Sequence, residues 1–191
     1  MHREPLLELL QQYDALWPQE RAVTQRIQSL VSQHADCFDR TCRPGHVTAS
    51  AWVTDAQAEY CLLVRHKKLD KWLQPGGHAD GQSDVAGVAR REVIEETGVS
   101  RLRLVDAVPL DLDVHPIPER RAQSGELIED AHDHHDIRFL FVADPSDPLV
   151  LSDESHEVRW CNEHELRQRT DEVSVIRLRE KALRVLRHAG V

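Results

Sequence analysis

The sequence has no long apolar run, and this absence narrows the classes of protein to which it can belong. A membrane-spanning helix needs about 20 mostly apolar residues, and no stretch approaches that length. The segment that follows Met1 carries acidic side chains and lacks the apolar centre of a signal peptide. We therefore expect no membrane partner and a cytoplasmic location.

Positive charge is also in short supply. The chain has 24 lysines and arginines against 33 aspartates and glutamates, which gives a formal net charge of −9. A general nucleic-acid binder needs a basic patch for phosphate contacts, so we expect no nucleic-acid partner. A phosphate-bearing small molecule stays compatible with this charge, because a bound metal ion reverses the local sign of a site.

Cysteine is scarce, and no two cysteines have the Cys-x-x-Cys spacing. Structural disulfides are rare in a reducing compartment, so we expect reduced cysteines that serve as packing residues. The four are Cys37, Cys42, Cys61 and Cys161.

The length of 191 residues fits one domain, with a helical N-terminal extension over 1–45 and a core over 46–191. Apolar spacing predicts two helices between Glu4 and His34, broken at Trp17–Pro18, which suit packing or a homodimer contact. We expect a long loop over Pro116–Asp133. The predicted strands are Thr48–Thr54, Tyr60–Arg65, Leu102–Val114, Ile137–Ala143 and Val158–Cys161, and the closing helices are Glu163–Arg169 and Glu172–His188.

The most informative segment is a glycine turn followed by an acidic helix. Pro75-Gly76-Gly77 precedes a helix predicted over 84–97, with Ser83 as its N-cap and Gly98 as its C-terminal stop. Three glutamates at positions i, i+3 and i+4 project from one face of this helix: Glu92, Glu95 and Glu96. Like charges at this spacing repel, whereas a hard divalent cation would bind them through oxygen. The segment therefore predicts a metal site, in preference to a merely solvated helix face.

The residues from Gly77 to Val99 resemble the Nudix box in both identity and spacing. Ser83 departs from the pattern, because the family has a glutamate there, and Asp84 lies beside it. The resemblance implies an α/β fold of the α+β type, an α/β/α sandwich with a mixed sheet. The matching residues are Gly77, Arg91, Glu92, Glu95, Glu96, Gly98 and Val99.

The resemblance also implies roles for these side chains. Glu92, Glu95 and Glu96, with the carbonyl of Gly76, would hold Mg²⁺ or Mn²⁺, and Arg91 would orient the carboxylates. Glu92, Glu95 and Arg91 form the predicted catalytic set, with Glu95 favoured as the general base. Acidic residues outside the helix are the alternative bases: Glu126, Glu129, Asp130, Asp153, Glu154 and Glu157.

Four residues are predicted to contact the substrate: Arg65, Gly77, His78 and Arg138. A second group, His132, His134 and His135, enters a predicted strand. Zinc ligation by these histidines with aspartate is conceivable, but substrate contact or surface placement is the favoured interpretation.

The predicted function is a metal-dependent hydrolysis of the diphosphate linkage in a nucleoside diphosphate derivative. One alternative is an enzyme similar to isopentenyl-diphosphate isomerase, for which Cys61 on a buried strand is a poor catalytic residue. Another is a non-catalytic nucleotide-sensing Nudix module, which only Ser83 favours.

Overall fold

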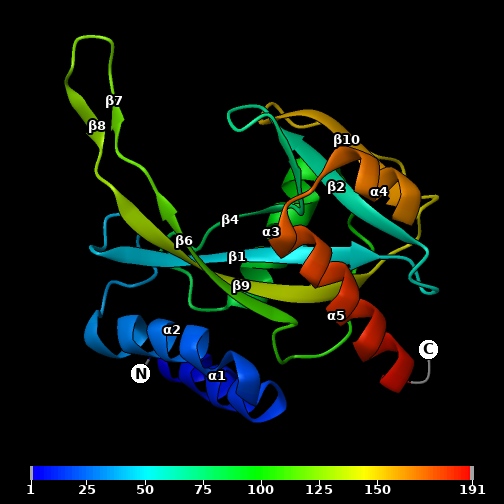
Figure 1. The fold of residues 1–191 in the computed structure, drawn as a ribbon, viewed down its shortest axis with the longest axis horizontal. Coiled ribbons are helices and arrows are strands. Elements are labelled where there is room, and N and C mark those ends of the chain that lie inside the picture. The colour runs from blue at the N-terminus through cyan, green and yellow to red at the C-terminus, as the bar shows by residue number, and fades with distance from the viewer. Residues whose placement is uncertain (1, 190–191) are drawn as a thin grey trace.

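A mixed β-sheet forms the centre of the computed structural model, which describes residues 2–189 (Figure 1). Its strands run in the order β10-β2-β1-β9-β5, with β3, β4 and β6 paired to β2, β1 and β9. The long central pair, β1 and β9, is parallel, and the other pairs are antiparallel. The strands are β1 (Gly45–Thr54), β2 (Tyr60–His66), β3 (Lys71–Leu73), β4 (Gly76–His78), β5 (Arg103–Leu104), β6 (Asp111–Ile117), β9 (His132–Val142) and β10 (Ser155–Asn162).

Helices cover both faces of this sheet, which confirms the predicted sandwich. Because side chains alternate along a strand, β1 sends Val47 and Ala49 to one face and Trp52 to the other. The first face packs against α1 (Glu4–Leu16), α2 (Arg21–Gln33) and α3 (Val85–Thr97). The second packs against α4 (Glu163–Arg169) and α5 (Val173–Ala189), which crosses in front of the sheet in Figure 1.

The two N-terminal helices form as predicted, with a short 3₁₀ helix, η1 (Pro18–Glu20), where Trp17–Pro18 breaks the pattern. Their apolar faces are buried inside the protein: Leu6, Leu10 and Tyr13 on α1 are at most 1% exposed. Lys181 of α5 donates to the Tyr13 hydroxyl at 2.6 Å and to Glu20 of η1 at 2.7 Å. The apolar faces of these helices therefore serve packing within the chain.

The acidic helix differs from prediction at its first residue. Asp84 is the N-cap of α3, because its carboxylate accepts from the Gly87 N–H at 3.0 Å. The predicted cap, Ser83, is thus wrong by one position. Gly98 ends the helix in the left-handed conformation at φ 76°, as predicted.

Two predictions between the acidic helix and β9 are wrong. The single strand predicted over Leu102–Val114 is divided into β5 and β6 by residues 105–110. The loop predicted over Pro116–Asp133 is mostly a two-stranded arm, with β7 (Arg120–Arg121) and β8 (Leu127–Glu129) extending beyond the sheet in Figure 1. The polar composition of this segment suits a solvent-exposed hairpin as well as a loop, because strands that leave the core bury no apolar face.

Within residues 2–189, no helix combines the length and the apolar character that crossing a bilayer requires. The four cysteines are free and buried.

Candidate active site

Strand β4 brings the glycine turn against the glutamates of α3. A Cβ atom on Gly77 would lie 2.6 Å from the carboxylate carbon of Glu92, so only glycine fits between strand and helix. The N–H of Gly76 donates to Glu96 Oε2 at 3.1 Å. The two glycines thus touch two of the three predicted ligands.

Arg91 lies across the remaining acidic face. Its guanidinium donates to the carbonyl of His78 at 3.0 Å and to Glu92 Oε1 at 2.7 Å, and it lies 3.8 Å from Glu95 Oε1. Asp84, the acidic residue beside Ser83, caps the helix. Arg91 therefore fixes β4 to α3 and holds the Glu92 carboxylate in place.

The three glutamates have different environments. Glu96 is 6% exposed, the Glu92 side chain 14% and the Glu95 side chain 60%. Burial raises the pKa of Glu96 to about 8, helped by repulsion from Glu92, Glu154 and Glu95, while the Gly76 N–H opposes the shift. Burial also raises the pKa of Glu92, although Arg91 lowers it in part. Negative charge is thus costly at this position, and a cation would relieve that cost.

The donor set fits a hard divalent cation. Glu92, Glu95 and Glu96 offer only oxygen, which Mg²⁺ and Mn²⁺ prefer. Two groups of described side chains already have ligand atoms within 4.8 Å of one another, and neither contains these glutamates. The carboxylates are therefore gathered on one surface but not closed around a point.

Glu154, an acidic residue outside α3, acts on this surface through its charge. It lies in the turn before β10, and its charge raises the pKa of both Glu92 and Glu96. The N–H of Lys67 donates to the carbonyl of Glu154 at 3.0 Å, which holds this turn against the end of β2. Glu126, Glu129 and Asp130 belong to the β7–β8 arm and the residues that follow it, where Glu129 pairs with Arg120 at 3.5 Å.

The predicted substrate contacts lie in three different environments. Gly77 belongs to the site, and His78 follows it on β4 but projects to the opposite face, toward His46. Arg138 is 3% exposed and bound by three carboxylates, so its charge is already neutralised. Arg65 is half exposed and pairs with Asp70 at 2.8 Å.

A family model for the NUDIX domain matches residues 44–179. The chain belongs to the Nudix family. The resemblance stated from the box is thus confirmed, and so is the prediction of a Nudix-type hydrolase. Nudix hydrolases generally need a divalent metal ion, usually Mg²⁺ or Mn²⁺. No curated protein matches the chain significantly.

Solved structures share the Nudix fold at low sequence identity. An Ap4A hydrolase from C. elegans aligns with a TM-score of 0.53 at 19% identity, over 76% of this chain and 98% of its own. A NUDIX-family hydrolase from Clostridium perfringens aligns with a TM-score of 0.52 at 20% identity, over 75% and 97%. The E. coli dihydroneopterin triphosphate pyrophosphohydrolase aligns with a TM-score of 0.54 at 16% identity, over 73% of this chain and 94% of its own. These likenesses establish the fold alone.

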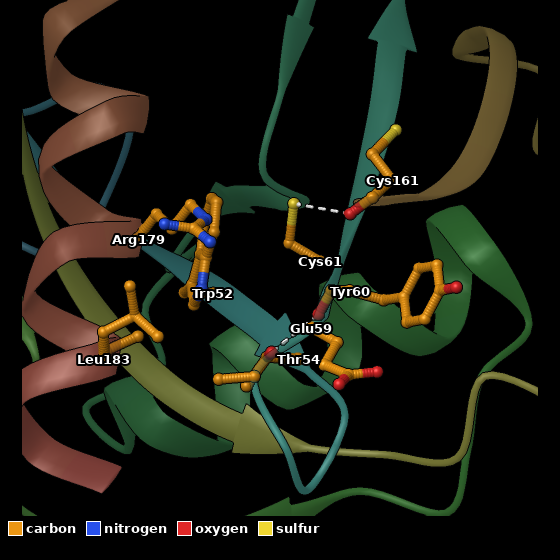
Figure 2. A pocket seen from close by; sticks show the side chains of 10 residues that line it. Trp52, Thr54, Glu59, Tyr60, Cys61, Cys161, Arg179 and Leu183 are labelled. Atoms are coloured by element: carbon orange, nitrogen blue, oxygen red, sulfur yellow. Dashed lines mark hydrogen bonds between the residues drawn. The ribbon is translucent and has the colours of Figure 1, made fainter. Parts of the chain in front are cut away.

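Two cavities of this protein lie away from the box, because no box residue lines either of them. Figure 2 shows the first, a space of about 10 Å³ between β1, β2, β10 and α5, which is barely enough for one water molecule. Cys61 lies there, its thiol donating to the carbonyl of Cys161 at 3.4 Å. Burial raises the pKa of the Cys61 thiol, which leaves it protonated and unreactive. The second is an open surface hollow of about 620 Å³ at the far end of β1.

One member of a histidine cluster was missed by the sequence analysis. His46 of β1 lies among the rings of His78, His132 and His134, and it was not named as a candidate. Nothing local marks it, because strand register alone brings His46 opposite His134, 88 positions along the chain.

Proposed function

We propose that this Nudix protein is a metal-dependent hydrolase that cleaves the diphosphate linkage of a nucleoside diphosphate derivative. The observation that carries the proposal is the pairing of β4 with α3. Two glycines expose main chain beside Glu92 and Glu96, and burial makes the negative charge of these carboxylates costly. A diphosphate with its cation would supply the positive charge that this surface lacks.

Each residue would have a distinct task. Glu92, Glu95, Glu96 and the carbonyl of Gly76 would hold the cation, and Arg91 would keep Glu92 oriented through its 2.7 Å contact. A bound Mg²⁺ or Mn²⁺ supplies charge neutralisation at the diphosphate and lowers the pKa of water. Gly77 leaves room for the Glu92 carboxylate to lie directly against the main chain of β4.

Two residues compete for the role of general base. Glu95 is the most exposed of the three helix glutamates, so it is free to meet a water molecule. Glu154 approaches the same surface from the turn before β10. We retain Glu95 as the first candidate and take Glu154 as the preferred alternative to it.

The two alternative functions have less support. The chemistry of an isomerase similar to isopentenyl-diphosphate isomerase requires an activated cysteine, and Cys61 is buried and protonated. A nucleotide-sensing module would not need all three helix glutamates, and these are retained.

In this proposal residues 46–191 form the catalytic core and residues 1–45 form its extension. We also propose that the protein is cytoplasmic.

Phosphate or nucleotide release from a substrate panel tests the proposal. The panel contains nucleotide sugars, dinucleotides, Ap4A and dihydroneopterin triphosphate, each with Mg²⁺, Mn²⁺ or chelator. We expect metal-dependent turnover of at least one compound and an orders-of-magnitude loss in Glu95→Gln, with Glu8→Gln on α1 as the matched control. No turnover of any compound would contradict the hydrolase, and equal turnover by Glu95→Gln would remove Glu95 from the mechanism.

A further inference from the structure

Five histidines gather on the face of the sheet opposite α3, namely His46, His78, His115, His132 and His134. Three of them come from three different strands: His46 from β1, His78 from β4 and His134 from β9. One ring nitrogen of each lies within 4.8 Å of the others. Their ring centroids are 5.1 Å apart for His46 and His78, 4.8 Å for His46 and His134, and 5.1 Å for His78 and His134.

Strand register explains how these rings meet. In the parallel pair, His46 is directly opposite His134. His78 is paired with Thr48, two residues after His46, so its side chain points to the same face. Strand pairing thus fixes the three backbone positions, so the three imidazoles are held close together on one face of the sheet.

Several nitrogens of this cluster have no partner. His46 is 1% exposed, and neither its Nδ1 nor its Nε2 makes a hydrogen bond. Nε2 of His134 is also buried without a partner. A buried polar atom without a hydrogen-bond partner is destabilising, so a cluster of them calls for a ligand. Imidazole binds metal ions in its neutral form through a ring-nitrogen lone pair, which these unpartnered nitrogens can supply.

We propose that His46, His78 and His134 form a zinc-binding site, separate from the box glutamates. Three neutral imidazoles suit Zn²⁺, whereas Mg²⁺ requires oxygen ligands. A zinc ion with three protein ligands keeps one position for water or another group. This site does not depend on the proposed hydrolase activity, because it requires no residue of α3.

His132 is the first candidate for the fourth position. Its ring stacks on that of His46 at 4.9 Å between centroids. Nδ1 of His132 lies 2.8 Å from the carbonyl of Asp130, an arrangement that places the proton on Nδ1, while Nε2 makes no hydrogen bond and lies 3.9 Å from Glu129 Oε1. A hydrogen bond of this kind on the far nitrogen orients many metal-bound histidines.

A second group of described residues has similar ligand spacing, namely His34, Asp36 and Cys42. Zinc binding there requires the Cys42 thiolate, and burial beside Asp36 raises the pKa of that thiol to about 12. His34 and Asp36 are not fully buried, so water can satisfy them. The histidine cluster is therefore the stronger candidate.

Calorimetric titration of the chelator-stripped full chain with Zn²⁺ tests the site, with Co²⁺ absorption as a probe of ligand geometry. We expect one Zn²⁺ per chain and a four-coordinate Co²⁺ spectrum. His134→Gln and His78→Gln should each weaken zinc binding by more than about 100-fold, since even loss of an outer partner costs about 10–100-fold. Both positions are only partly buried, and circular dichroism checks that each variant folds.

Three controls separate this site from others. His156→Gln changes an exposed histidine on β10, Cys42→Ser removes the second group, and Glu96→Gln alters the box; each should keep zinc affinity within about threefold, an energy below 1 kcal/mol. Zinc should also raise the melting temperature of the native chain but not that of His78→Gln. The proposal would be overturned if the native chain bound no zinc, or if His134→Gln and His78→Gln bound zinc as tightly as the native chain does. A loss of affinity confined to Cys42→Ser or Glu96→Gln would also overturn it.

Discussion

The two faces of strand β4 contrast sharply, although they are one residue apart. On one face, Gly77 lies against Glu92 of α3, and the donors are carboxylate oxygens. On the other, His78 joins His46 and His134, and the donors are imidazole nitrogens. The first group depends largely on one helix, whose 3.6-residue period aligns its glutamates. The second depends entirely on strand pairing, because its members come from three strands.

The electrostatic states of the two groups differ as much as their origins. The glutamates repel one another, and Arg91 only partly offsets that repulsion. The histidines are neutral, and their cost is the absence of hydrogen bonds rather than charge. A hard cation would therefore relieve the repulsion among the glutamates, and a zinc-like cation would give the histidine nitrogens the partner they lack. The predictions below separate these two responses.

The largest expected effect is at Glu96. Glu96→Gln removes a proposed metal ligand without changing the size of the side chain, so turnover with Mg²⁺ should fall by at least about 1000-fold, the equivalent of about 4 kcal/mol. Steady-state kinetics on the best substrate of the panel measures the effect. Because the histidine site lies on the other face of β4, zinc affinity should stay unchanged in Glu96→Gln. Turnover within about tenfold of the native value would contradict the role of Glu96 as a metal ligand.

A smaller loss is expected when the space between β4 and α3 is filled. In Gly77→Ala the new methyl group would meet the Glu92 carboxylate, whose carbon lies 2.6 Å from that position. We expect destabilisation of about 1–3 kcal/mol from overpacking and a turnover loss of about 100-fold from displaced ligands. Chemical denaturation and kinetics measure the two effects.

The double variant Gly77→Ala/Glu92→Asp is the control for this explanation. A shorter acid removes the clash, so stability should recover even though turnover does not. If the double variant were less stable than Gly77→Ala, the clash with Glu92 would not be the cause of the destabilisation.

The pH dependence of stability should also distinguish the two faces. The folded state raises the pKa of Glu96 from an ordinary 4.5 to about 8, so it holds this proton more tightly than the unfolded chain does. The metal-free protein should therefore lose stability as the pH rises from about 4.5 to about 8, by a few degrees in melting temperature. Glu96→Gln should lack most of this loss, and Mg²⁺ should reduce it in the native chain. A melting temperature that rises over the same range would show that other groups dominate.

The smallest effect is expected at the departure from the family pattern. Ser83→Glu supplies the acid that the family pattern has at this position, while Asp84 keeps its capping hydrogen bond to Gly87. We expect turnover to rise no more than a few-fold, because Arg91 already contacts Glu92 and the carbonyl of His78, and a second ion pair at the surface adds about 0–1 kcal/mol. Parallel kinetics of the native and Ser83→Glu chains is the measurement. Lost turnover would show that this loop is built differently from the family pattern.

Local sequence was sufficient wherever the deciding interactions are close along the chain. The break at Trp17–Pro18, the stop at Gly98 and the box helix all follow from short-range rules of proline, glycine and helical period. The one-residue error at the cap has a local reason too, since Ser83 and Asp84 are both good N-caps and only the backbone geometry chose between them. The polar segment after β6 misled for the same reason, because its composition fits either an exposed hairpin or a loop.

Tertiary structure decided the properties that depend on distant neighbours. Arg138 reads as a free cation in the sequence, but folding surrounds it with Asp111, Asp113 and Asp136. Glu154 gained its place beside the box from the turn before β10, and His46 gained its place from a parallel pairing. The sequence by itself determined the identities and the helical alignment of the box glutamates, because helix geometry is local. Only the fold decided which charges are buried and which rings meet, because those depend on strand register across the sheet.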